Sequence, residues 1–183
     1  MPESLGRVLK PSCISGVKLC NMTSEAGIDG LDARLIELLE AEPRIGVLEC
    51  SRRLGVARGT VQARLDKLAE RGVIRGFGPN VDPAALGYPV MAFVTLELRQ
   101  AVGHFSVAQH LGRIPEVLEA HTVTGQGDLL CRIVARTNAE LQSVIDRVLA
   151  SEGVIHATTV IALAEQIPYR TLPLVGEAAR DQR

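Results

Sequence analysis

The chain is poor in aromatic residues and has no long apolar run. Only 3% of its 183 residues are aromatic and none is tryptophan, although 46% are hydrophobic, so aliphatic side chains must build its cores. No stretch approaches the ~20 apolar residues that span a bilayer. The first twenty residues lack the apolar region of a signal peptide, because Lys10, Pro11 and Lys18 interrupt it. These absences predict a soluble cytoplasmic protein that has no membrane partner.

Cysteines and catalytic motifs are also scarce. The four cysteines, at positions 13, 20, 50 and 131, form no CxxC pair, and Cys50 and Cys131 have apolar neighbours, so we expect reduced, structural thiols. The sequence has no HExxH, GxSxG or Walker motif, and its histidines are dispersed at positions 104, 110, 121 and 156. No catalytic residue, metal site or cofactor is therefore predicted.

Basic residues are concentrated in one part of the chain. The net charge is −1, but residues 44–75 contain eight basic and three acidic residues. Residues 83–175, in contrast, contain six basic and eight acidic residues. The local positive excess indicates a surface that binds a polyanion.

The same basic segment has the pattern of a DNA-binding unit. Helices are predicted over residues 30–42, 47–54 and 58–71, with a tight turn at residues 54–56. Gly72 should end the third helix in a left-handed conformation. Residues 73–77 and the PNVDP segment after them predict a β-hairpin. This order is that of a winged helix-turn-helix, whose second motif helix enters the major groove.

The third predicted helix has one face for the core and one for DNA. Its apolar stripe consists of Val61, Leu65 and Leu68. Side chains on the other face are expected to contact base edges, because Arg pairs well with guanine and Gln with adenine, and Gly59 permits close approach. The predicted base contacts are Arg58, Thr60 and Gln62. Phosphates are expected to bind Arg52, Arg53 and Arg75, with Lys67 on the same surface, whereas Arg64 should bind either a phosphate or an acidic neighbour.

A second unit follows a linker rich in proline and glycine. Strands are predicted over residues 90–98, 117–124, 129–135 and 154–163, and helices over 105–112 and from Asn138, the expected N-cap, to about residue 149. The first strand lacks clear alternation, so it should be buried on both faces or paired. The order βαββαβ is that of a ferredoxin-like sandwich, and the fold class is α+β. Its uncovered sheet face predicts a homodimer.

These elements divide the chain into five parts. We expect a flexible leader at residues 1–28, the winged helix-turn-helix domain at 29–82, a linker at 83–89, the ferredoxin-like domain at 90–168 and a flexible tail at 169–183. Met22 is an alternative start of translation.

The turn between the two middle strands of the second unit is the candidate ligand site. It consists of Thr124, Gly125, Gln126, Gly127 and Asp128. Glycines expose backbone N–H groups that suit a carboxylate, and Asp128 offers an acceptor for an ammonium, so the turn could hold a free amino acid. The alternative is a tight hairpin in which Gly and Asp serve only the backbone.

The combined pattern resembles the leucine-responsive and asparagine-operon (Lrp/AsnC) family of regulators. The resemblance extends from Leu31 to about Gln166, and rests on LDARLIELLEAEPR, RLGVARGTVQARLDKLAERGVI, VDPAALG, Pro115-Glu116-Val117 and VTGQGDLL. It implies an effector site at the turn, between subunits, and assembly beyond a dimer. The chain departs from the family pattern at Ala57, where a Ser or Thr cap is usual, and at Gly127 and Leu129, where aromatics are common.

The predicted function is sequence-specific regulation of transcription. An amino acid or related small metabolite would change the oligomeric state and the affinity for double-stranded DNA. Two alternatives remain open at this point. One is an enzyme similar to the sirohaem decarboxylases, which share this two-domain scaffold, and the other is an architectural protein that binds DNA with little specificity.

Overall fold

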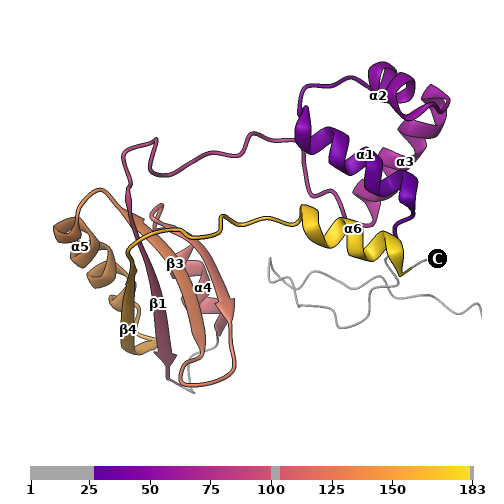
Figure 1. Ribbon diagram of the computed structural model, residues 1–183. Helices are drawn as coiled ribbons and strands as arrows, with labels where there is room; N and C mark the ends of the chain where they lie inside the picture. Colours follow the sequence, from indigo (N-terminus) through magenta and orange to yellow (C-terminus); the bar gives the residue numbers. More distant parts are fainter. Residues whose placement is uncertain (1–26, 100–103, 182–183) are drawn as a thin grey trace, which may run out of the picture. The chain divides into compact units, whose positions relative to one another are not determined.

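The computed structural model describes residues 27–99 and 104–181 of the chain. It contains two compact units (Figure 1). Of the described residues, 27–80 and 166–181 belong to one unit, and 81–99 and 104–165 to the other. Among these residues, no helix has both the length and the apolar character that crossing a bilayer requires.

The first unit is helical and contains the predicted helix-turn-helix. Its helices are α1 (Gly30–Ala41), α2 (Val47–Leu54), α3 (Arg58–Glu70) and α6 (Leu172–Arg180). Asp29 begins α1 through a capping box, since its Oδ1 accepts hydrogen bonds from the backbone of Leu31 and Asp32 while Asp32 Oδ2 accepts one from Asp29 N. Gly55, at φ 69°, turns the chain between α2 and α3, and Gly72, at φ 70°, follows α3 as predicted.

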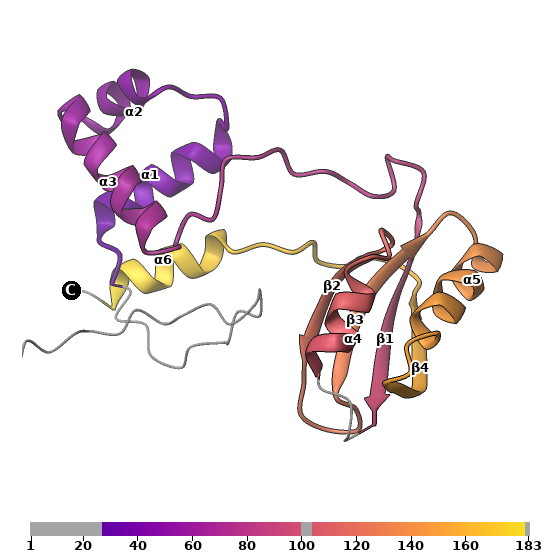
Figure 2. The same cartoon turned by 180° about the vertical axis from the view of Figure 1, so that it is seen from behind.

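The helices of this unit share one apolar core. It is built on Leu35 of α1, Cys50 of α2 and the α3 stripe, in which Val61 and Leu68 are 1% exposed. Val175, Ala178 and Ala179 of α6 pack against the same core, and α6 lies beside α1 in both views (Figures 1 and 2). The expectation of a flexible tail is therefore wrong for residues 172–180. Its short apolar stripe is partly buried against the helix-turn-helix core, and this packing orders the segment.

The hairpin predicted after α3 is also absent. Residues 73–89 contain no strand and run as an extended connection with a turn at residues 83–87. The physical reason lies in Gly76, Gly78 and Pro79, because glycine weakens a strand and proline cannot donate to a ladder. A lone two-stranded hairpin is marginal even without these residues. The helix-turn-helix is confirmed, but no wing accompanies it in this part of the structure.

The second unit has the predicted βαββαβ order. Its elements are β1 (Val90–Leu98), α4 (His104–Leu111), β2 (Val117–Thr122), β3 (Leu129–Ala135), α5 (Asn138–Leu149) and β4 (Val154–Ala162). The strands form an antiparallel sheet in the order β2-β3-β1-β4. Both helices cover one face of this sheet (Figure 2), where Leu96, Ile133 and Val144 belong to a core closed to solvent. Thr137, whose hydroxyl oxygen accepts a hydrogen bond from Glu140 N, is the N-cap of α5 in place of the predicted Asn138.

The opposite face of the sheet is not covered by any described element of this unit. Along β1, Ala92, Val94 and Leu96 are buried under the helices, while Phe93 is 39% exposed on the other side. Of the two possibilities predicted for β1, pairing is the one observed: the strand is paired on both edges, and only one of its faces is buried. The uncovered surface is called the outer face below. On this face, Phe93 of β1 lies between its register partners, Arg132 of β3 and Val160 of β4.

Candidate functional site

The recognition helix α3 presents one polar face to solvent. Arg58, Gly59, Thr60, Gln62 and Lys67 are all exposed. A side chain added at Gly59 would meet nothing within 4 Å, so the protein itself leaves this position open. The N-terminal half of α3 is therefore available to a ligand as large as a DNA groove.

Two of the predicted DNA-binding arginines are held by acidic neighbours. Arg53 forms ion pairs with Glu42 at the end of α1 and with Glu49 of α2, the latter at 3.1 Å. Its pairing with Glu42 and Glu49 raises the pKa of the Arg53 guanidinium. These contacts connect α2 to the end of α1, so Arg53 serves the packing of the unit.

Arg64 is bound in the same manner at the start of α1. It pairs with Asp29 and, at 2.9 Å, with the buried Asp32. The hydrogen bond from Arg64 lowers the pKa of the Asp29 carboxyl group, and the hydrogen bond to Asp29 raises the pKa of Arg64. The sequence predicted either a phosphate or an acidic neighbour as the partner of Arg64. In the structure, which contains no DNA, Arg64 pairs with acidic neighbours.

The other basic residues of this surface are less constrained. Arg52 lies 3.5 Å from Glu49 at an exposed position. Arg58, Lys67 and Arg75 have no acidic partner among the described residues. Arg75 lies in the extended connection after α3 and not in a wing. Gln62 Nε2 donates to Asp66 Oδ1 at 2.9 Å, which leaves its second N–H and its oxygen available to a base.

The candidate effector turn is held against β1 by its own backbone and by Asp128. Asp128 N donates to Leu96 O at 2.9 Å, and Asp128 Oδ2 accepts from Leu98 N at 2.7 Å. Gly125 has φ 120°, and a Cβ at Gly127 would lie 2.3 Å from Thr95 Cγ2. Glycine at 127 thus permits close approach to β1. One oxygen of Asp128 has a structural role, and its Oδ1 has no hydrogen bond within the described residues.

A cavity of about 470 Å³ lies beside this turn. It brings together three of the predicted effector residues with side chains from three strands. It is lined by Thr95, Glu97, Val123, Thr124, Gln126, Gly127, Leu130 and Thr158. Gly125 and Asp128 belong to the same turn but do not line the cavity.

Sequence reasoning missed the strand residues of this cavity. Thr95 and Glu97 occupy alternate positions on β1, and Thr158 is the register partner of Thr95 on β4. The polar alternation of Thr95 and Glu97 was a signal that they share a face. Their approach to the turn depends on strand pairing, which the local pattern does not specify.

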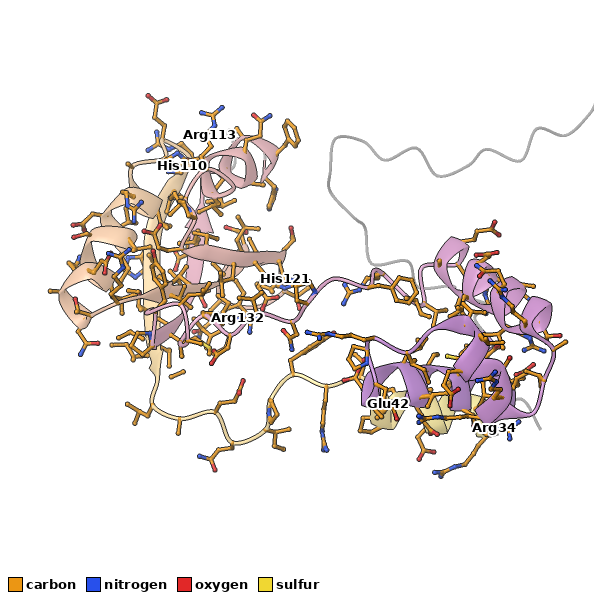
Figure 3. All side chains as sticks on the ribbon, turned by 90° about the horizontal axis from the view of Figure 1, so that it is seen from above. Arg34, Glu42, His110, Arg113, His121 and Arg132 are labelled. Carbon is orange, nitrogen blue, oxygen red and sulfur yellow. The ribbon has the colours of Figure 1, made fainter. Side chains whose placement is uncertain are left out.

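The histidines and cysteines have other surroundings. His110 Nε2 donates to Arg147 O at 2.7 Å. His121 lies 3.6 Å from Glu119, and Glu119 also pairs with Arg132 at 3.0 Å. His110, His121 and Arg132 are labelled in Figure 3. Among the described residues, no cluster of three metal-ligating side chains exists. Cys50 and Cys131 are buried free thiols, and burial raises the pKa of Cys131 to about 11. Cys13 and Cys20 lie outside the described residues.

The helix-turn-helix unit and the sheet unit both match domains of known proteins. Residues 28–69 match the AsnC-type helix-turn-helix domain, and residues 90–172 match the Lrp/AsnC ligand binding domain. The HTH-type transcriptional regulator FL11 of Pyrococcus furiosus is 33% identical over 148 residues, which cover 80% of this chain and 97% of FL11. The chain belongs to the Lrp/AsnC family. The resemblance noted in the sequence is thereby confirmed.

Other Lrp/AsnC proteins match over similar lengths. The structure of Escherichia coli AsnC superposes with a TM-score of 0.73 at 29% identity, over 80% of this chain and 99% of AsnC. The complex of the Neisseria meningitidis transcriptional regulator NMB0573 with L-methionine has a TM-score of 0.70 at 26% identity, over 80% of this chain and 97% of that protein. The family match ends at residue 172, so nearly all of α6 lies beyond it.

Proposed function

We propose that this Lrp/AsnC protein is a homo-oligomeric regulator of transcription that binds DNA through α3 and an amino acid or related metabolite beside the Thr124–Asp128 turn. The observation that carries the proposal is the exposed N-terminal half of α3, which follows the α2 turn and presents Arg58 without an acidic partner among the described residues. Because a regulator of this kind acts on DNA, we place it in the cytoplasm.

The division of roles on the DNA surface follows from the pairing of the side chains. Arg58, Thr60 and Gln62 would contact base edges, with Gly59 allowing the helix to approach the groove. Arg52, Lys67 and Arg75 would contact phosphates. Arg53 and Arg64 would remain on their acidic partners and support the DNA surface by holding α2 and α3 against the ends of α1, since breaking those pairs opposes DNA binding.

The effector would bind with its carboxylate on the amides of the turn and its α-ammonium directed toward Oδ1 of Asp128, which follows the lining residue Gly127 but does not itself line the cavity. A cavity of this size falls within the range of small-molecule sites, and the L-methionine complex of the Neisseria relative supports the ligand class. Binding at a site next to the outer face would shift the equilibrium between assemblies. A coupling of roughly 1–3 kcal/mol would suffice to regulate DNA affinity.

Nothing in the described residues favours the enzyme alternative, and we propose that the protein is not an enzyme. The relatives that this chain matches over almost their whole length are transcriptional regulators. Two of the four histidines contact protein groups, His110 at a backbone carbonyl and His121 near a carboxylate.

Fluorescence anisotropy with the DNA upstream of the protein's own gene tests the proposal. A scrambled duplex serves as the control, over a series of salt concentrations and with or without pooled amino acids. We expect preference for the upstream duplex and a change of affinity when amino acids are added. Equal, steeply salt-dependent binding to both duplexes would instead indicate an architectural protein. Absence of binding to either duplex would contradict both roles, and a tetrapyrrole titration would then follow.

The variant Asp128→Asn tests the effector site in the same assay. Asparagine keeps an oxygen that accepts from Leu98 N but removes the negative charge. Weaker effector binding by a protein that still binds DNA is expected. Unchanged effector affinity would show that Asp128 does not hold the ammonium.

A further inference from the structure

The helical unit is assembled from two separate parts of the chain. Residues 27–80 supply α1, α2 and α3, whereas α6 follows the last strand of the sheet unit. The sheet unit is therefore an insertion in the helical unit, and two connections join the units. Nearly all of α6 lies beyond residue 172, where the family match ends, so the second connection leads to a helix outside that match.

Both connections leave the sheet unit at the same end. One ends at Tyr88 just before β1, and the other begins after Ala162, the last residue of β4. Ala162 is the register partner of Met91 on β1, so the connections start from neighbouring strands. Tyr88 is fixed to the sheet unit, because its hydroxyl oxygen accepts a hydrogen bond from Arg136 at 3.2 Å and its ring centroid lies 5.1 Å from the guanidinium.

The two connections differ in reach. Val73 and Ile74 still pack against the core of the helical unit, so the first connection consists of residues 75–87. At roughly 3.3 Å per residue, residues 75–87 can span at most about 43 Å, and residues 163–171 at most about 30 Å. While α6 is docked, the shorter connection limits how far the helical unit can move. Without this limit the accessible volume would increase by about threefold, the cube of the ratio of the two reaches.

The docking of α6 depends on apolar packing alone. Its apolar stripe contacts the core of the helical unit, but no residue of α6 is fully buried. Across the described chain, the only ion pair or side-chain hydrogen bond of α6 joins Glu177 to Arg180 within the helix itself. Thr171 gives α6 no side-chain cap, Gly176 disfavours a helix, and so short a helix is unstable alone. Release of α6 therefore breaks no polar contact with α1, α2 or α3.

We propose that α6 is a releasable tether, a second attachment of the helical unit that lasts only while α6 is docked. This inference rests on the proposed function, because it takes α3 as the helix that contacts bases and a dimer as the form that binds DNA. With α6 docked, each helical unit of the dimer is confined to a smaller volume, so the second half-site is bound at a higher effective concentration. With α6 released, binding to a single half-site is unchanged, but binding to two half-sites is weaker.

Lengthening the shorter connection tests the tether while α6 keeps its contacts. A flexible segment of about nine Gly and Ser residues, inserted between the exposed Ala164 and Glu165, removes the limit on reach. Fluorescence anisotropy should show about threefold weaker binding to a duplex with two half-sites and unchanged binding to one half-site. The same segment appended after Arg183 is the matched control and should change neither affinity. If α6 only stabilises the helical unit, the insertion changes neither affinity, and that result would overturn the inference.

Hydrogen exchange tests whether α6 is released separately. Amides of α6 should exchange faster than those of α1 in the wild type. Gly176→Ala should slow exchange in α6 by about fivefold, because alanine favours the helix and its Cβ would meet nothing within 4 Å. Equal exchange in α6 and α1 would show that α6 is a fixed part of the unit and would overturn its release.

The wild-type affinities separate failure of the inference from failure of the proposed function. Tighter wild-type binding to two half-sites than to one, unchanged by the insertion, would reject the tether and leave the regulator intact. Equal affinity for the two duplexes would overturn both the inference and the dimer on which it rests. Absence of binding to either duplex would contradict the proposed function as a whole. Matching thermal melts of wild type, insertion and control exclude misfolding as the cause.

Discussion

At the level of single residues, the N-terminus of α3 lacks the side-chain cap that α5 has. Ala57 offers no oxygen to the first N–H groups of α3, whereas the Thr137 hydroxyl accepts from Glu140 N at 3.1 Å. Since such a cap contributes ~1 kcal/mol, Ala57→Ser should raise the free energy of unfolding of the helical unit by about that amount. Thr137→Ala should lower that of the sheet unit similarly. Peptide-resolved hydrogen exchange measures both, and an Ala57→Ser protein with unchanged exchange in α3 would contradict the prediction.

The pair between Arg64 and Asp29 predicts how stability depends on pH. Arg64 lowers the pKa of Asp29 below its ordinary value of 3.8. The folded state therefore favours the ionised carboxylate, and this stabilisation is present above pH 3.8 and is lost as the pH falls through the lowered pKa. Arg64→Met should destabilise the helical unit at pH 7 by at least about 1 kcal/mol, because it breaks the partly exposed pair with Asp29 and also leaves the buried Asp32 without its cation.

The difference between wild type and Arg64→Met should shrink below pH 4. Urea titrations of both proteins between pH 2.5 and pH 7 measure it. Arg58→Met, which removes an arginine of α3 with no acidic partner in the described chain, is the control and should show no such dependence. A difference that stays constant with pH would show that the pair with Asp29 does not stabilise the folded unit.

Among the elements, α6 makes the DNA-binding unit depend on the C-terminal segment. Val175 packs against the helix-turn-helix core, while Leu174 beside it is 67% exposed. Val175→Asp would place a charge against that core, at a cost of about 2 kcal/mol. We expect faster hydrogen exchange in α1 and weaker DNA binding, with exchange in β1 unchanged. Leu174→Asp is the matched control, and equal effects of the two variants would show that α6 does not stabilise this unit.

The elements also show which parts of the fold local sequence can predict. The spacing of Val61, Leu65 and Leu68 specified α3 because a buried helix stripe has a period that only a helix satisfies. The missing hairpin and the unexpected α6 could not be predicted because both depend on tertiary packing. The segment with Gly76 and Pro79 pairs with no strand, whereas α6 packs against the helix-turn-helix core. The charged residues near the C-terminus obscured the apolar spacing of Leu172, Val175 and Ala179.

The candidate ligand site was predictable to a similar degree. The turn was located from its glycines and Asp128, because those residues act locally on the backbone. The contribution of Glu97 and Thr158 was not, since these residues are 61 positions apart in the sequence and meet only through the pairing of β1 with β4. Long-range register is specified by the whole sheet and cannot be derived from one segment.

At the scale of the whole molecule, the outer face of the sheet is the surface through which the proposed oligomer would form. Phe93 and Val160 are register partners on this face, 39% and 62% exposed, and Met91 and Leu130 extend the apolar surface. Large adjacent apolar side chains are typical of a protein interface. Two copies that pair through this face would present two α3 helices to DNA, which predicts a pseudo-palindromic site with half-sites one helical turn, ~34 Å, or a multiple of it apart.

Phe93→Glu should therefore separate the subunits and weaken DNA binding together. The new carboxylate would lie opposite Arg132, so the isolated sheet can accept it, whereas a dimer interface would bury it. Light scattering should show half the wild-type dimer mass. Affinity for a duplex with two half-sites should fall about 100-fold because the two binding events are no longer linked, while affinity for a single half-site stays unchanged. Leu149→Glu, equally exposed at 39% but on α5, should leave mass and affinity intact. A Phe93→Glu protein of wild-type mass would show that the subunits associate through another surface.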